Sequence, residues 1–150
     1  MQWPHEMIVE SYAMEGEDVI ISSLFRNKLN DGLFFDIGCS EPVNNSNSYF
    51  FYKRGWRTLA VDGRDLSARW KVDRPKDCFV HGLLGGETGS AEFWTFPDPT
   101  MNTADTHTAE RYAERFLNSE ISRSILPVER AYDMWQERFQ ELTHATADSA

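Results

Sequence analysis

The chain has 150 residues, of which 41% are hydrophobic and 13% aromatic, so it can bury a core and is not composed like a disordered protein. Its formal net charge of −9 argues against binding to nucleic acid, because a duplex-binding surface needs clustered Lys and Arg. Cys39 and Cys78 lack CxxC spacing, which argues against a metal site or disulfide framework and favours a reducing compartment. We expect one soluble, cytoplasmic domain over residues 1–150 that does not enter a membrane, because no leader opens the sequence and no apolar run approaches ~20 residues.

Apolar residues alternate along the chain between the spacing of an amphipathic helix and the continuous runs of buried parallel strands. In chain order we expect a helix over residues 18–29, a strand at 33–37, a helix over 44–54, a strand at 56–61, a helix over 66–72 and strands at 78–84 and 91–96. The glycine-rich turn at residues 85–89 predicts that the last two strands pair as a hairpin. Helices over 108–118 and 129–142 follow, with a short segment at 124–128 between them and a frayed tail at 144–150.

Two neighbouring apolar runs end in an acid that a glycine soon follows. The first run ends in Phe35-Asp36-Ile37-Gly38-Cys39, and the second ends in Val61-Asp62-Gly63. Parallel strands in an α/β fold bring such ends to one edge, where a glycine turn lies under a nucleoside and the second acid accepts hydrogen bonds from ribose hydroxyls. These residues therefore predict a nucleoside-cofactor site.

Two further blocks accompany these motifs in a fixed order. Residues 11–18 read Ser-Tyr-Ala-Met-Glu-Gly-Glu-Asp, and residues 46–57 contain Ser-Asn-Ser-Tyr and then Tyr-Lys-Arg-Gly-Trp-Arg. The pair Asn102-Thr103 is a weaker echo of the same pattern. Together with residues 35–39 and Val61-Asp62, this ordered set resembles the FkbM-type S-adenosylmethionine-dependent methyltransferases over residues 11–104.

The resemblance implies an α/β, Rossmann-like methyltransferase fold that is partial here, with three parallel strands plus an extra hairpin strand and flanking helices. It implies S-adenosyl-L-methionine as cofactor and O-methylation of a hydroxyl on a small-molecule, sugar or glycan acceptor. The residues assigned to cofactor binding are Glu17, Asp36, Gly38, Cys39, Asn47 and Asp62. No residue is assigned as the catalytic base, and the four histidines read as packed or surface residues.

The residues after Gly38 favour a methyl donor over a dinucleotide. No further glycine of a G-x-G-x-x-G motif clears space for a pyrophosphate, and Glu41 would place a negative charge there. An acidic rim of Asp36, Glu41 and Glu17 suits a cofactor that carries a sulfonium and an ammonium. Each residue retains a structural alternative, such as a strand-end turn for Asp62 or a solvated first-turn acid for Glu17.

The sequence departs from the family after residue 142. Such methyltransferases continue with an apolar strand into Asp-Val-Glu-Gly, whereas this chain ends within eight residues. We expect the C-terminal half of the domain to be missing, so that the strand at 33–37 has an open edge that a second copy or another partner would cover. The alternatives are the cofactor-binding half of an enzyme, or a non-catalytic, truncated module for binding or interaction. A nicotinamide-dependent oxidoreductase is disfavoured by the missing glycines.

Overall fold

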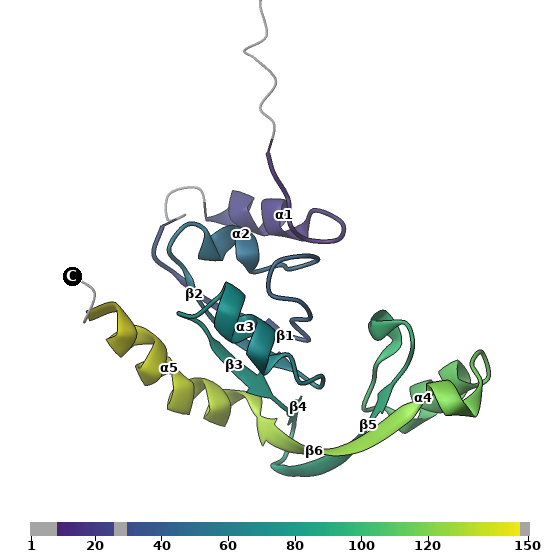
Figure 1. The fold of residues 1–150 in the computed structure, drawn as a ribbon. Helices are drawn as coiled ribbons and strands as arrows, with labels where there is room; N and C mark the ends of the chain where they lie inside the picture. The colour runs from purple at the N-terminus through teal and green to yellow at the C-terminus, as the bar shows by residue number, and fades with distance from the viewer. Residues whose placement is uncertain (1–8, 26–29, 148–150) are drawn as a thin grey trace, which may run out of the picture.

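The computed structural model describes residues 9–25 and 30–147, and its centre is a three-stranded parallel sheet. The strands β1 (Leu33–Ile37), β2 (Arg57–Asp62) and β3 (Cys78–His81) lie in the order β1-β2-β3 (Figure 1). Helices flank this sheet, so the predicted α/β class with three parallel strands is confirmed, and the arrangement is compatible with a Rossmann-like fold. The carboxyl ends of β1 and β2 lie at one edge, with Ile37 in register with Val61.

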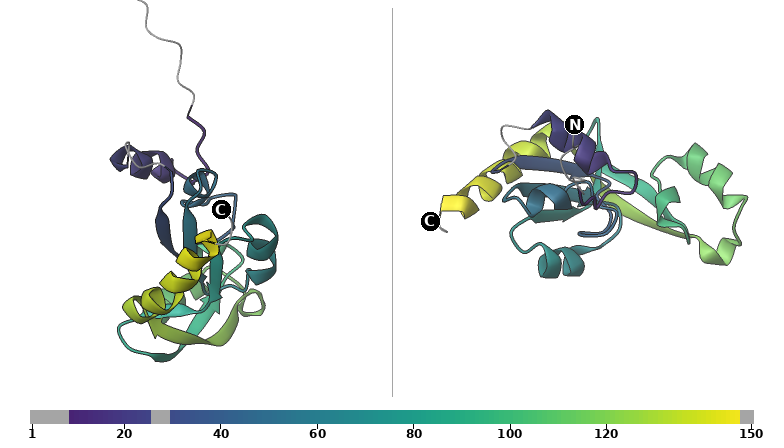
Figure 2. Two further views of the ribbon diagram at one scale, coloured as in Figure 1. Left: turned by 90° about the vertical axis from the view of Figure 1, so that its left-hand side faces the viewer. Right: turned by 90° about the horizontal axis from the view of Figure 1, so that it is seen from above.

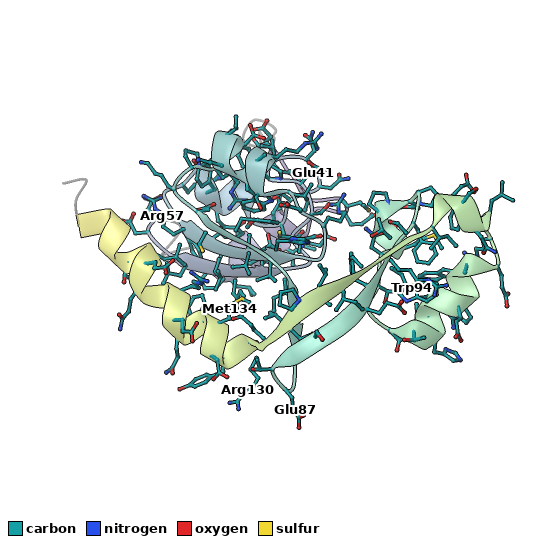
Figure 3. The ribbon with its side chains drawn as sticks, turned by 60° about the horizontal axis from the view of Figure 1, so that its bottom comes forward. Glu41, Arg57, Glu87, Trp94, Arg130 and Met134 are labelled. Atoms are coloured by element: carbon teal, nitrogen blue, oxygen red, sulfur yellow. The ribbon has the colours of Figure 1, made fainter. Side chains whose placement is uncertain are left out.

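Helices cover both faces of this sheet (Figure 2). Successive side chains of β2 point to opposite faces, so each face presents apolar groups to a helix. Leu59 and Val61 pack against Met134 of α5 (Ala131–Ala147), which points toward the sheet in Figure 3. Ala60 points to the opposite face and packs against Trp70 of α3 (Ser67–Asp73). The short helix α2 (Tyr49–Tyr52) and α1 (Glu17–Leu24) lie over the β1 end of that second face.

A second sheet carries an extension that we call the arm (residues 89–130). The strands of this second sheet are β4 (Leu83–Gly85), β5 (Gly89–Thr95) and β6 (Ser122–Arg130), in the order β4-β6-β5, and β5 and β6 belong to the arm. The arm also contains α4 (Thr106–Ala113) and the 3-10 helices η1 (Pro99–Met101) and η2 (Asn118–Glu120). Trp94, Phe96 and Ala109 form the arm's own apolar cluster, and Figure 3 places Trp94 inside it.

The extra hairpin strand predicted at residues 91–96 is wrong in its pairing. β5 does not pair with β4, because β6 lies between them, parallel to β4 and antiparallel to β5. The predicted strand at 78–84 is likewise two strands, β3 and the start of β4, separated at Gly82. The short segment expected at 124–128 is therefore the central strand of the second sheet.

Several helix boundaries also differ from the prediction. The helix expected over 44–54 spans only Tyr49–Tyr52, because Asn45 has a left-handed φ of 55° and the Ser46 hydroxyl accepts a hydrogen bond from the Tyr49 amide. The helix α4 begins two residues early, where Asp105 caps it through the Thr108 amide at 2.7 Å. The helix α5 continues through residues 144–147, which were expected to be frayed, while residues 26–29 and 148–150 lie outside the described chain.

Candidate functional site

A cavity of about 790 Å³ lies where the carboxyl ends of β1 and β2 face the arm. The part of the chain that precedes the arm contributes the start of α1, the turns after β1 and β2, and the segment after β3. The arm contributes Phe93 and most of residues 98–104. The volume lies within the ~300–1,000 Å³ range typical of small-molecule sites, and the ends of parallel strands are where α/β folds usually bind ligands.

The structure brings four of the six predicted cofactor residues to this cavity. Glu17, Gly38, Asn47 and Asp62 line it, and they come from α1, the two strand ends and the loop before α2. Asp36 and Cys39 are not in the lining. These four residues come from segments up to 45 residues apart in sequence, from Glu17 to Asp62, and the arm adds residues as far along the chain as Ala104.

Gly38 forms a tight turn that leaves open space above it. Its φ is 70°, in the left-handed region that favours glycine, and its amide donates to the Val61 carbonyl at 2.8 Å. A Cβ built at this position would meet no heavy atom within 4 Å. The turn thus allows a ligand to approach the backbone without obstruction from the protein.

Asp62 joins the turns that follow β1 and β2. One carboxylate oxygen accepts a hydrogen bond from the Ser40 amide and the other from the Arg64 amide, each at 2.8 Å. The Arg64 Nε lies 3.6 Å from the same carboxylate. A carboxylate offers about four acceptor positions, so Asp62 can hold both turns and still accept a hydrogen bond from a ligand in the cavity.

Asp36 and Cys39 lie beneath the cavity and are not part of its lining, so the expected place of Asp36 in the acidic rim is wrong. Asp36 is 5% exposed, and burial raises the pKa of its carboxyl against the opposing effects of Ser48 and Arg74. Cys39 is 3% exposed and packs with Ala60 and Trp70, and burial raises the pKa of its thiol. Cys39 is therefore a small core residue rather than an exposed thiolate.

Acids outnumber bases in the described lining of the cavity. Its acids are Glu17, Glu41, Asp62 and Asp98, and its one base is Arg64. Glu41 bridges two arginines, since one carboxylate oxygen lies 3.9 Å from Arg64 and the other pairs with Arg69. The rim is acidic, as expected, but the charge of Glu41 is largely balanced and Arg64 adds a cation that the sequence argument did not include.

The arm closes the cavity with polar groups that sequence reasoning did not assign. Asp98 accepts hydrogen bonds from the amide and hydroxyl of Thr100 at 3.0 and 2.7 Å. The side-chain Oδ1 of Asn102 accepts a hydrogen bond from the Phe96 amide at 2.9 Å. Phe93 approaches Gly63 so closely that a Cβ there would lie 2.4 Å from its ring. Gly63 was the signal in the sequence for this contact, because a residue without a side chain permits another group to approach the backbone closely.

The buried cation Arg74 holds together the loop that carries Asn47. Arg74 is 1% exposed, and its Nε lies 2.6 Å from the Asp77 carboxylate. Its other nitrogens donate to the hydroxyls of Ser48 at 2.8 Å and Thr58 at 2.6 Å. Arg74 thereby connects α3, β2 and the start of α2, and nothing in its local sequence indicated this role.

The blocks at residues 11–18 and 46–57 meet in space through Asp18. This fully buried carboxylate accepts hydrogen bonds from the Ser11 hydroxyl and the Tyr12 amide, both at 2.7 Å. The Tyr12 carbonyl in turn accepts from the Ser46 amide at 2.9 Å. Asp18 therefore fixes the segment that leads to Glu17 against the loop that carries Asn47.

Comparisons with known proteins add no family assignment. Neither protein-family models nor curated proteins nor solved structures give a match to this chain. Within residues 9–25 and 30–147, no helix is both long and apolar enough to cross a membrane. In the same described residues, no three His, Cys, Asp or Glu side chains converge where they could hold a metal ion.

Proposed function

We propose that the chain is an S-adenosylmethionine-dependent methyltransferase, or the cofactor-binding half of one, that acts on a hydroxyl group of a small-molecule or glycan acceptor. The observation that carries this proposal is the cavity at the ends of β1 and β2, where open space above Gly38 adjoins the carboxylate of Asp62. The ordered sequence blocks that resemble FkbM-type enzymes support the same cofactor.

The cavity's residues suit this cofactor chemically. Asp62 would accept hydrogen bonds from the ribose hydroxyls, and the backbone turn at Gly38 would lie beneath the nucleoside. Glu17 and the other lining acids would attract the ammonium and sulfonium charges. When bound, S-adenosylmethionine supplies an electrophilic methyl group, and the role of these side chains is to bind and orient it.

The arm side of the cavity suits a hydroxylated acceptor. Asp98 uses one carboxylate oxygen for Thr100, which leaves the second oxygen available to a ligand. Thr100 and Asn102 add hydroxyl and amide groups to the same wall. Holding an acceptor hydroxyl in line with the methyl group is the main catalytic requirement of such a transfer.

A non-catalytic module for binding or interaction is the second candidate. The outer edge of β1, along which no strand pairs within residues 9–25 and 30–147, favours it, because an unpaired strand edge is a ready surface for another chain. Methyl transfer by the isolated chain to any hydroxylated acceptor would exclude this alternative. Cofactor binding without transfer to a broad panel of acceptors would favour it.

Substitution of Asp62 tests the proposed cofactor site. We expect Asp62→Asn to weaken binding of S-adenosylhomocysteine about tenfold or more, because a charge-assisted hydrogen bond contributes about 1.5–3 kcal/mol. Isothermal titration calorimetry measures the change. Asp65→Asn is the matched control, since Asp65 is a fully exposed acid outside the cavity lining, three residues along the chain. Equal affinity of Asp62→Asn and wild type would refute the assignment.

A further inference from the structure

Methyl transfer to a hydroxyl group requires a group that takes the hydroxyl proton. Only side chains that line the cavity can contact an acceptor there. The described lining contains no histidine, lysine, tyrosine or cysteine. Its ionisable proton acceptors are therefore four carboxylates, those of Glu17, Glu41, Asp62 and Asp98.

Three of these carboxylates are occupied by other contacts. Glu41 is paired with two arginines. Each oxygen of Asp62 accepts a backbone amide of a strand-end turn at 2.8 Å. One oxygen of Glu17 accepts the Glu15 amide at 2.8 Å at the start of α1. All three come from the part of the chain that also contributes Gly38, so they lie with the proposed cofactor residues rather than on the arm.

Asp98 is the one lining acid that the arm contributes. Its Oδ1 accepts hydrogen bonds from the amide and the hydroxyl of Thr100 at 3.0 and 2.7 Å. Among the described residues, Oδ2 has no hydrogen-bond partner. Thr100 and Asn102 lie on the same wall of the cavity. One oxygen of Asp98 therefore fixes the carboxylate, and the other is available to an acceptor.

The backbone holds Asp98 in a defined position. Pro97 and Pro99 flank it, and each proline ring fixes its own φ. Asp98 caps the 3-10 helix η1, and its carbonyl accepts a hydrogen bond from the Met101 amide at 3.1 Å. Figure 1 shows this part of the arm, between β5 and α4, on the side that faces the parallel sheet. The carboxylate is thus ordered before a ligand binds, as a catalytic group needs to be.

We propose that Asp98 is the general base of the methyl transfer and that its Oδ2 accepts the proton of the acceptor hydroxyl. The inference rests on the proposed function and adds the residue that the sequence did not assign. In the step, a lone pair of the acceptor oxygen forms the bond to the methyl carbon. The carbon–sulfur bond breaks, and both of its electrons go to sulfur. The hydroxyl proton passes to Asp98, which then releases it to water.

A weakly basic carboxylate is sufficient for this step. The hydroxyl and amide of Thr100 hold the pKa of Asp98 below its ordinary 3.8, so the carboxylate is ionised at neutral pH. An alcohol does not give its proton to such a base before the reaction. Its oxygen becomes positively charged as the new bond forms, however, and the proton is then acidic enough to transfer. Asp98 acts at that point, in the transition state.

Substitution of Asp98 by asparagine tests the role. A transfer assay with radiolabelled S-adenosylmethionine and a panel of sugars, glycosides and phenols selects the best acceptor of the wild-type chain. With that acceptor, Asp98→Asn should lower kcat about 10²–10⁴-fold with little change in KM, because a general base contributes about this much. Asparagine caps a helix as well as aspartate does, so the start of η1 is retained while the proton acceptor is lost.

Asp105→Asn is the matched control. Asp105 is a second fully exposed acid of the arm, and it caps α4 through the Thr108 amide as Asp98 caps η1 through the Thr100 amide. It lies outside the described lining of the cavity. Asp105→Asn should therefore keep the wild-type kcat.

Two further measurements distinguish a base from a residue that only supports the fold. The wild-type kcat should be constant from mildly acidic to mildly alkaline pH, because Asp98 stays ionised. The residual kcat of Asp98→Asn should rise with pH, because hydroxide then has to take the proton. Calorimetry should give Asp98→Asn the wild-type affinity for S-adenosylhomocysteine, and its complex with this product should bind the acceptor as the wild-type complex does.

The outcomes separate this inference from the proposed function. A wild-type chain that does not bind S-adenosylhomocysteine would refute both. Wild-type binding together with wild-type kcat in Asp98→Asn would overturn the role of Asp98 alone. The same conclusion would follow if Asp105→Asn lost as much activity, or if a chain that binds S-adenosylhomocysteine transferred no methyl group to any acceptor of the panel.

Discussion

Replacing Gly38 with alanine separates the turn's conformational role from its role in admitting a ligand. The φ of Gly38 is 70°, and the left-handed conformation costs an L-residue about 1–2 kcal/mol. The added Cβ meets no heavy atom within 4 Å, so steric conflict adds nothing to that cost. We expect Gly38→Ala to lower the free energy of unfolding by about 1–2 kcal/mol. It should also weaken S-adenosylhomocysteine binding, because the methyl group occupies space that the ligand needs.

Gly16 provides a matched control for this experiment. Its φ is 82° and a Cβ there also meets nothing within 4 Å, but Gly16 is outside the cavity lining. Gly16→Ala should therefore lose a similar amount of stability and bind the ligand like wild type. Urea unfolding measures stability, and calorimetry on the folded variants measures affinity. Wild-type affinity in Gly38→Ala would refute the claim that a ligand lies against this turn.

Two further substitutions test the framework beneath the cavity. Arg74→Met should lower the free energy of unfolding in urea by about 3–5 kcal/mol, because it leaves Asp77 buried without its partner. The exposed pair of Arg69 and Glu41 is the control, and Arg69→Met should cost under about 1 kcal/mol; equal losses would contradict the role of Arg74. The pH dependence of stability tests the buried Asp36. Burial raises the pKa of its carboxyl above the ordinary 3.8. The protonated carboxyl therefore contributes to the free energy of unfolding fully below pH 3.8, and this contribution is lost as the pH rises through the raised pKa. Asn does not titrate, so the free energy of unfolding of Asp36→Asn should rise relative to that of wild type on going from acid to neutral pH. Urea unfolding at both pH values measures this difference, and a fall instead of a rise would refute the raised pKa.

The parallel sheet could be predicted because its strands are continuous apolar runs. The strand predicted at 33–37 has the observed bounds, since only a strand covered on both faces has so many apolar residues in sequence. The acids at the ends of two such runs then identified the edge where the cavity lies. Local sequence was sufficient here because each strand is short and its end is marked by a glycine.

The second sheet could not be predicted from local patterns. The strand β6 contains Pro127, which normally argues against a central strand, and its first residues are exposed. It inserts between β4 and β5 from far along the chain, so no turn signal announces the pairing. The adjacent strands at 78–84 and 91–96 therefore appeared to be a hairpin.

The site residues that local sequence could place are those at strand ends, and the ones it could not place depend on burial or on long-range pairing. Gly38 directly follows β1 and Asp62 is the last residue of β2, so their position at the sheet edge comes with the fold. Asp36 lies one residue before the end of β1, on the face shared with Phe34, so its side chain is buried beneath the site. The arm's contribution depends on the long-range pairing of β5 with β6, which local reasoning missed.

Calorimetric titration of the wild-type chain with S-adenosylhomocysteine tests the central claim most directly. We expect saturable binding with micromolar affinity at one site per chain, with sharply reduced affinity in Asp62→Asn. Absence of binding to a correctly folded chain would contradict it.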